Sequence, residues 1–351
     1  MKTTAIEAPL LSVNDLAVSF CVSGDVAIPA VDGVSFSIKK NETVALVGES
    51  GSGKTVTALS ILRLLPYPSA FHPKGTIDFA GHDILSMSEQ KLKTVRGNAI
   101  SMIFQEPSKS LNPLMTVEKQ ISETLLLREK APAKVIRERV LELLDLVKLA
   151  HAPKRLGAYP HELSGGERQR IMIAMALAHN PKILIADEPT TALDVTTEAQ
   201  ILTLLQDIQK KLGMALLLIT HDLAITRKMA DRVCVMKAGK IVEQGKTEQI
   251  FDHPKHPYTK MLITSEPEGM PPKIKHNAKE IISTRNMKVH FPIKSGIFRR
   301  TTGHIKAVDG VDVLIKQGQT VGVVGESGSG KTTLALALLR LLKSDGDIVL
   351  D

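Results

Sequence analysis

A glycine-rich octapeptide that ends in lysine and threonine occurs twice in this chain of 351 residues. Each copy fits the pattern G-x-x-x-x-G-K-[ST], in which glycines let backbone N–H groups surround a phosphate chain. The lysine of the pattern reaches the outer phosphates and the hydroxyl group binds Mg²⁺. The first copy consists of Gly48, Glu49, Ser50, Gly51, Ser52, Gly53, Lys54 and Thr55, and the second of Gly325, Glu326, Ser327, Gly328, Ser329, Gly330, Lys331 and Thr332. Both copies therefore predict a nucleotide site, with Thr55 and Thr332 as metal ligands.

Three further polar residues, Asp187, Glu188 and His221, each follow a short apolar run downstream of the first copy. Phosphoryl transfer depends on positioning and charge neutralisation, and a carboxylate on a rigid strand end can orient an attacking water. Two adjacent carboxylates after a buried strand cost free energy unless another group compensates their charge. Their position therefore favours a catalytic role for Asp187 and Glu188 over a place on a solvated surface. His221 alone would be a structural histidine, but its position after another apolar run favours a role in the same site.

A second potential anion site lies at Ser164-Gly165-Gly166, within a segment at 163–170 that leads into an apolar stretch at 171–178 typical of a helix. A hydroxyl and unobstructed amides at a helix N-terminus favour phosphate. Gln105 precedes this segment and Asp194 follows the carboxylate pair, so both complete an ordered series of polar motifs after the first loop.

The elements that must position these residues alternate in type. Apolar runs at 43–47, 183–186 and 215–219 are typical of buried strands, and 56–65 is a helix-forming stretch after the first loop. Three such strands with polar residues at their carboxyl ends predict an open α/β sheet whose site lies on that edge. Residues 105–163 should form a mostly helical subdomain, in which 135–149 has the spacing of an amphipathic helix.

The sequence around the first loop is duplicated. Residues 31–65 and 308–342 align without a gap and about two-thirds of their positions are identical, which marks a repeated module. A stretch rich in proline and charge lies between the modules. We therefore predict a complete domain at 8–262, a linker at 263–280 and the N-terminal part of a second domain at 281–351.

Composition is that of an ordinary globular chain with a net charge of +8 from 45 Lys+Arg and 37 Asp+Glu. The excess of positive charge fits a solvated basic surface, nucleotide binding or proximity to anionic lipid headgroups, and charge alone does not choose. Cys21 and Cys234 are the only cysteines, which excludes a disulfide framework and fits a reducing cytosol. No apolar run approaches the roughly 18–20 residues that span a bilayer, so a membrane role would act through partners.

Taken together, the phosphate loop, the Ser-Gly-Gly segment and the carboxylate pair resemble the ATP-binding-cassette (ABC) family. The resemblance implies a P-loop NTPase cassette, α/β, with a parallel-sheet core, an antiparallel β subdomain and a helical subdomain, plus an incomplete second cassette. It implies ATP and Mg²⁺ as cofactors, with Lys54 on the β- and γ-phosphates. Thr55 and Gln105 should bind the metal, and Asp187 should hold it directly or at one remove.

The same resemblance assigns the remaining residues. Glu188 should polarise the attacking water, and His221 should sense the γ-phosphate and position that water, with Gln105 completing the catalytic set. Ser164, Gly165, Gly166 and Asp194 should belong to the nucleotide-binding residues, since the Ser-Gly-Gly segment closes over ATP held by an opposite cassette. Phe20 and Phe291 lie where the family stacks an aromatic ring on adenine, although each could equally be an ordinary core residue at a strand end.

Four details resemble the oligopeptide/dipeptide/nickel importer ATPases: the segments 110–114, 159–163 and 189–195, and a His-Pro-Tyr extension at 253–259. The tandem arrangement is similar to the Yej-type ATPases that power import of peptides and microcin C. This implies two membrane permease subunits as partners, a periplasmic peptide-binding protein acting indirectly, no direct nucleic acid, and a peripheral location on the cytoplasmic face of the bacterial inner membrane. Residues 290–300 resemble an insertion of that group or form a basic surface loop.

The second module stops before the motifs that complete the first one. We therefore expect that one chain of this length leaves both composite sites incomplete, and that ATP is hydrolysed slowly unless two first modules pair or another ATPase chain contributes. Two alternatives stay open: a soluble tandem-cassette ATPase that acts on ribosomes or nucleic acid, and an inactive truncated fragment.

Overall fold

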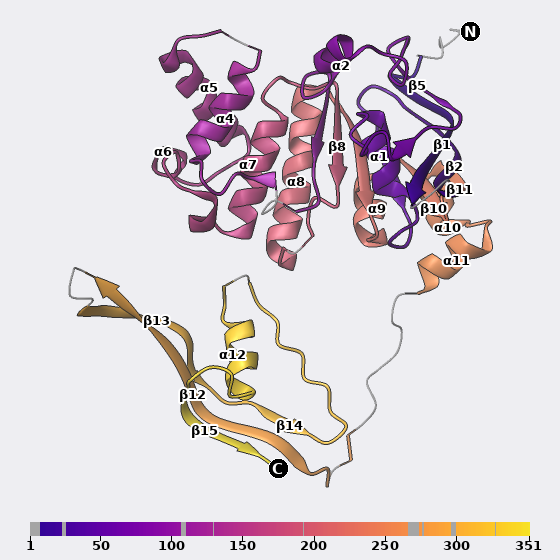
Figure 1. The fold of residues 1–351 in the computed structure, drawn as a ribbon. Helices are drawn as coiled ribbons and strands as arrows, with labels where there is room; N and C mark the ends of the chain where they lie inside the picture. Colours follow the sequence, from indigo (N-terminus) through magenta and orange to yellow (C-terminus); the bar gives the residue numbers. More distant parts are fainter. Residues whose placement is uncertain are drawn as a thin grey trace, which may run out of the picture. The chain divides into compact units, whose positions relative to one another are not determined.

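The computed structural model describes residues 8–22, 26–106, 110–128, 130–191, 193–265, 274–275, 277–295, 300–326 and 328–351. The chain divides into two compact units, the first formed by Met1–Leu193 and Glu198–Glu266 and the second by Pro267–Asp351 together with Asp194–Thr197. Figure 1 shows the elements of both units along the chain. Within the described residues, none of the helices combines the length and the apolar character that crossing a membrane requires.

A six-stranded sheet in the order β11-β10-β3-β9-β8-β7 forms the centre of the first unit. Its strands are β3 (Thr43–Val47), β7 (Ile100–Ile103), β8 (Ile183–Asp187), β9 (Ala215–Thr220), β10 (Arg232–Lys237) and β11 (Lys240–Lys246). Five of them pair in parallel and only β11 is antiparallel, to β10. The parallel strands β3, β8 and β9 are buried along their whole length, as their unbroken apolar runs require.

An antiparallel sheet accompanies this core and consists of β1 (Leu11–Val22), β2 (Val26–Ile38), β4 (Ala70–Phe71), β5 (Thr76–Phe79) and β6 (His82–Asp83). One apolar cluster joins the two sheets, because Leu11 and Ile38 of the antiparallel sheet and Leu46 and Ile185 of the parallel sheet belong to it. Packing one sheet on the other fixes the position of the loop that follows β3.

One set of helices packs beside the sheets, and a second set forms a separate helical group (Figure 1). Those near the sheets are α1 (Lys54–Ile61), α2 (Glu89–Val95), α8 (Val195–Leu212), α9 (Leu223–Met229), α10 (Thr247–Asp252) and α11 (Pro257–Thr264). The helical group consists of α4 (Val117–Leu126), α5 (Ala133–Leu146), α6 (Ala152–Arg155), the 3₁₀ turn η1 (Pro160–Glu162) and α7 (Gly165–Ala176). The predicted fold class, with a parallel core, an antiparallel subdomain and a helical subdomain, is therefore confirmed.

Two predicted helices have different bounds. The stretch 56–65 is helical only to Ile61, because Arg63 takes a left-handed backbone conformation (φ +48°) and ends the helix. The amphipathic helix expected at 135–149 is α5, which buries Ile136, Val140, Leu143 and Leu144 on one face. It ends early because the chain turns at Lys148, where φ is +54°.

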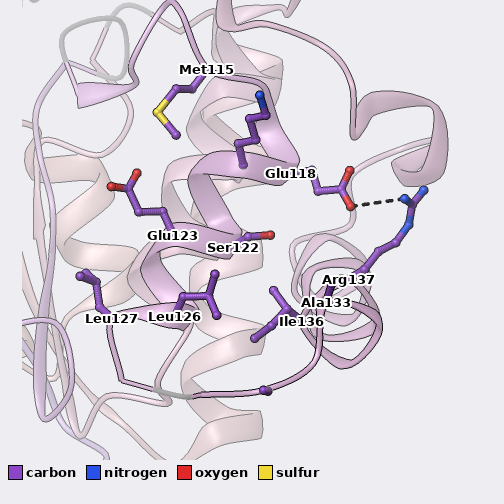
Figure 2. A pocket seen from close by; sticks show the side chains of 11 residues that line it. Met115, Glu118, Ser122, Glu123, Leu126, Leu127, Ala133, Ile136 and Arg137 are labelled. Carbon is purple, nitrogen blue, oxygen red and sulfur yellow. Dashed lines mark ion pairs between the residues drawn. The ribbon is translucent and has the colours of Figure 1, made fainter.

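A hollow of about 780 Å³ opens between α4 and α5 (Figure 2). Leu126, Leu127 and Ile136 give it an apolar wall, and the ion pair of Glu118 with Arg137 (3.5 Å) lies at its rim. It contains none of the residues predicted to bind nucleotide.

The second unit contains a sheet of β12 (Glu280–Ser295), β13 (Arg300–Val311), β14 (Leu314–Lys316) and β15 (Asp345–Leu350), with the helix α12 (Lys331–Leu338). Met287, Val289, Val308, Leu334 and Ala337 form its small core. The predicted basic insertion at 290–300 falls on the ends of β12 and β13, which pair antiparallel, while residues 296–299 lie outside the described residues.

Candidate functional site

The first phosphate loop connects β3 to α1 and depends on glycine at its first and sixth positions. Gly48 has φ +149°, and a Cβ there would lie 2.1 Å from the carbonyl oxygen of Met236 on β10. Gly53 has φ +100°, and a Cβ there would lie 2.8 Å from the carbonyl oxygen of Ala30. Only glycine tolerates both the conformation and the contact, so these residues fix the curvature of the loop.

Lys54 begins α1, and its side chain folds back over the loop. The Nζ atom donates to the carbonyl oxygens of Gly48 and Glu49 (2.8 Å each) and to the hydroxyl oxygen of Ser52 (3.3 Å). Lys54 is 5% exposed. Burial lowers the pKa of its ammonium group, opposed by the nearby carboxylates of Glu188 and Asp187. A buried cation at a helix N-terminus makes this loop strongly attractive to phosphate.

Asp187, the last residue of β8, reaches the helix that follows the loop. Its carboxylate accepts a hydrogen bond from the Thr55 hydroxyl (3.2 Å), so the two predicted metal ligands lie side by side. Burial raises the pKa of Asp187 to about 6, although the bond from Thr55 acts in the opposite direction. Burial disfavours the anionic form of this carboxyl group, and a nearby cation would stabilise that form.

Glu188 is the centre of a hydrogen-bonded cluster. Its Oε2 accepts from Gln105 Nε2 (2.8 Å) and from the Thr191 hydroxyl (2.9 Å), and its Oε1 lies 3.1 Å from His221 Nδ1. Burial raises the pKa of Glu188, but the bonds from Thr191, His221 and Gln105 outweigh it, so the net shift is downward. The carboxylate is thus ionised and held in one orientation, as a group that polarises water must be.

The backbone around Glu188 explains this orientation. The residue has φ +45°, which is unusual for a side chain other than glycine, and its N–H donates to the carbonyl oxygen of Ile219 on β9 (2.9 Å). The chain turns sharply at the carboxyl end of β8, and this turn directs Glu188 and Asp187 to different partners. Adjacent carboxylates of this kind can do different chemistry.

The Ser-Gly-Gly segment forms the N-terminus of α7, as predicted. The Ser164 hydroxyl accepts from the N–H of Glu167 (3.2 Å), and the Glu167 carboxylate accepts from the N–H of Ser164 (2.8 Å). This reciprocal capping box fixes the start of the helix, with Gly165 and Gly166 as its first residues. Asp194 takes part in a similar local arrangement, since its carboxylate accepts from the N–H and the hydroxyl of Thr197 (3.0 and 2.8 Å).

The two candidate adenine-stacking residues have different surroundings. Phe20 is on β1, is partly buried, and packs against the core that joins the two sheets. Phe291 is on β12, is 41% exposed, and pairs across the hairpin with Ile305. Both positions remain predictions.

The second phosphate loop has the same internal hydrogen bonds as the first. Lys331 Nζ donates to the carbonyl oxygens of Gly325 (2.7 Å) and Glu326 (2.6 Å), and Gly330 takes φ +93° before α12. Gly328, Ser329 and Thr332 are described, whereas Ser327 lies outside the described residues. Residues 320–324, which correspond to β3, do not form a strand.

Two residues of the site were missed by sequence reasoning. Thr191 holds Glu188, and it was noted only as part of a family-typical segment. Tyr258 lies in the His-Pro-Tyr extension, yet its hydroxyl oxygen accepts a hydrogen bond from the N–H of Glu49 in the phosphate loop (3.1 Å). The extension suggested a subgroup of the family, and nothing in the sequence indicated that it reaches the loop.

Two family descriptions match this chain. The description "ABC transporter" matches residues 31–191 and 308–351, which covers both phosphate loops. The description "Oligopeptide/dipeptide transporter, C-terminal region" matches residues 242–289, which includes α10 and α11. The predicted resemblance to importer ATPases of the oligopeptide/dipeptide type is therefore confirmed.

Curated relatives and a solved structure agree with this. The chain is 59% identical over 99% of its length to the peptidoglycan transport ATP-binding protein YejF of Agrobacterium fabrum, of which it spans 63%. It is 47% identical over 84% of its length to the oligopeptide transport ATP-binding protein OppD of Bacillus subtilis, and covers 87% of that protein. The dimeric ATP-binding cassette MJ0796, solved bound to ADP and Pi, superimposes with a TM-score of 0.60 at 29% identity, over 68% of this chain and 98% of that one. The chain belongs to the ABC transporter family.

Proposed function

We propose that this chain binds and hydrolyses ATP as the energising subunit of a membrane importer of peptides. The cluster around Glu188 carries the enzymatic part of this proposal, because it holds an ionised carboxylate close to a second carboxylate, Asp187, that reaches the phosphate loop. The names of the relatives, which refer to transport of peptidoglycan and oligopeptides, support the importer and its substrate class.

In the proposed mechanism the first loop binds the phosphates through its backbone amides and Lys54. Glu188 then orients a water in line with the γ-phosphate and accepts a proton from it, while Thr191 and His221 hold the carboxylate still. His221 is well placed to respond to the γ-phosphate because its side chain is 67% exposed at this edge. Ser164, Gly165 and Gly166 would close over nucleotide held by an opposite cassette.

Mg²⁺ fits the residues at the start of α1. The Thr55 hydroxyl and the Asp187 carboxylate lie 3.2 Å apart and provide hard oxygen ligands of the kind that Mg²⁺ prefers. When bound, the metal would supply charge neutralisation on the phosphates. We propose Gln105 as a further ligand, which would require its amide to leave Glu188, the partner it has in this structure.

The partners follow from the importer role. We propose two permease subunits as direct partners, a periplasmic peptide-binding protein that acts through them, and a location on the cytoplasmic face of the bacterial inner membrane. An apolar hollow of about 260 Å³ beside the Gln105 segment, lined by Leu64, Phe104 and Met172 among others, is where we expect a permease helix to dock. Such a contact would link transport to the position of Gln105 and, through it, Glu188.

The test is ATP-dependent uptake. The chain would be copurified with its permease from native membranes and reconstituted in proteoliposomes with ATP inside and a labelled peptide plus binding protein outside. We expect uptake that is lost with Lys54→Ala. Copurification with RNA instead of a permease, or uptake independent of ATP, would contradict the proposal.

A further inference from the structure

One peptide group of the first phosphate loop is held at both of its ends. The carbonyl oxygen of Gly48 accepts from Lys54 Nζ (2.8 Å), and the N–H of Glu49, which belongs to the same planar peptide group, donates to the Tyr258 hydroxyl oxygen (3.1 Å). Glycine at position 48 leaves this peptide group free to rotate, because its backbone lacks the restriction that a Cβ imposes. The two bonds therefore determine which way the peptide group points.

Tyr258 is itself rigidly placed. It is 3% exposed, and the ammonium of Lys237, the last residue of β10, lies 4.6 Å from the centre of its ring. Its N–H donates to His256 Nδ1 (3.1 Å), and the Glu243 carboxylate accepts from the N–H groups of Lys255 (2.9 Å) and His256 (3.0 Å). The extension is thus anchored to β11, and its tyrosine reaches the loop from a fixed base.

We propose that Tyr258 is a positioning residue for nucleotide binding, which the extension supplies to the phosphate loop; this rests on the proposed ATP site at Lys54. The three N–H donors of the Lys54 ammonium go to Gly48, Glu49 and Ser52 in this structure, so a bound phosphate must compete for them. Tyr258, whose bond to the N–H of Glu49 does not involve the lysine, then carries a larger share of the restraint on that peptide group. The Tyr258 hydroxyl therefore stabilises the nucleotide-bound state more than the free state. A group that stabilises the two states unequally changes the affinity for nucleotide.

Tyr258→Phe tests this directly, because it removes the hydroxyl and keeps the ring under Lys237. We expect about tenfold weaker ATP binding by calorimetric titration and a similar rise in KM, which at 1.4 kcal/mol per factor of ten corresponds to the net strength of about one hydrogen bond. We expect kcat to change less than about threefold, because the cluster around Glu188 is untouched. The matched control is Tyr67→Phe, at a tyrosine that is 42% exposed and lies on a different part of the first unit.

A second variant leaves the tyrosine in place. Glu243→Gln weakens the anchor of the extension, so KM for ATP should rise in the same direction by a smaller factor. Unchanged ATP affinity in both variants, or a lower melting temperature of Tyr258→Phe with wild-type affinity, would overturn the inference. Failure of the proposed function is distinguishable, because the unmodified chain would then bind ATP no better than Lys54→Ala.

Discussion

The backbone of Gly48 lies so close to β10 that no side chain fits between them, and replacing this glycine by alanine tests how the first loop is built. A Cβ at this position would lie 2.1 Å from the backbone carbonyl oxygen of Met236. The contact must open by roughly 1 Å before it approaches an ordinary van der Waals separation. Met236 yields little, since it is fully buried in β10, whereas Gly48 lies just beyond the end of β3. The shift therefore falls largely on the loop.

A displacement of about 1 Å in a positioning element can lower catalytic efficiency by about two orders of magnitude. We expect Gly48→Ala to lower kcat/KM for ATP by about that factor. The strained backbone adds a cost in stability, since φ is +149°. Phosphate release measures kcat/KM, and urea unfolding measures the stability.

Gly81→Ala is the matched control, because Gly81 also has a positive φ (+84°) but would place its Cβ in open space, in the turn between β5 and β6. It should lose stability through backbone strain and keep kcat/KM. If Gly48→Ala retained wild-type kcat/KM, the close packing of the loop on β10 would not position the phosphates, and this part of the reasoning would be refuted.

Two further predictions concern stability. Because the pKa of Asp187 is raised from 3.8 to about 6, the folded protein binds more protons than the unfolded chain between these values, and stability falls as pH rises through that window. Asp187→Asn should therefore stabilise the nucleotide-free protein at pH 8, by at most about 3 kcal/mol, and lose this advantage below about pH 4; a pH-independent difference in urea unfolding would contradict this. Arg168 donates to the carbonyl oxygens of Pro160 and Leu163 (2.8–3.1 Å), so Arg168→Lys should cost about 1–2 kcal/mol because an ammonium cannot match this geometry. An unchanged unfolding midpoint would refute it.

Much of the fold follows from the sequence because its signals are local and mutually consistent. The buried runs at 43–47, 183–187 and 215–220 are strands, and their carboxyl ends deliver the loop, the carboxylates and His221 to one edge of the sheet. The start of α7 was equally predictable, since Ser164 and Glu167 form a capping box with a recognisable spacing. Helix ends were less predictable, because single left-handed residues such as Arg63 decide them.

The contacts within the site were less accessible to sequence reasoning. Glu188 and His221 were predicted to share a site, but their bond depends on the left-handed backbone of Glu188, which no pattern indicates. The contact of Tyr258 with Glu49 joins residues more than two hundred positions apart. Such a contact depends on how α11 packs beside β10, and tertiary packing of this kind leaves no periodic signal in the sequence.

The central claim is that the loop at Lys54 binds ATP and Glu188 supports its hydrolysis. The most direct measurement is phosphate release together with ATP affinity for Glu188→Gln, with Glu142→Gln, whose side chain is 64% exposed, as the control. We expect turnover to fall by about two orders of magnitude or more, because general-base assistance is lost. We expect the ATP dissociation constant to change by less than about threefold, because the phosphate loop is unchanged and one glutamine oxygen can still accept from Thr191. Wild-type turnover of Glu188→Gln, or loss of its ATP binding, would contradict this account.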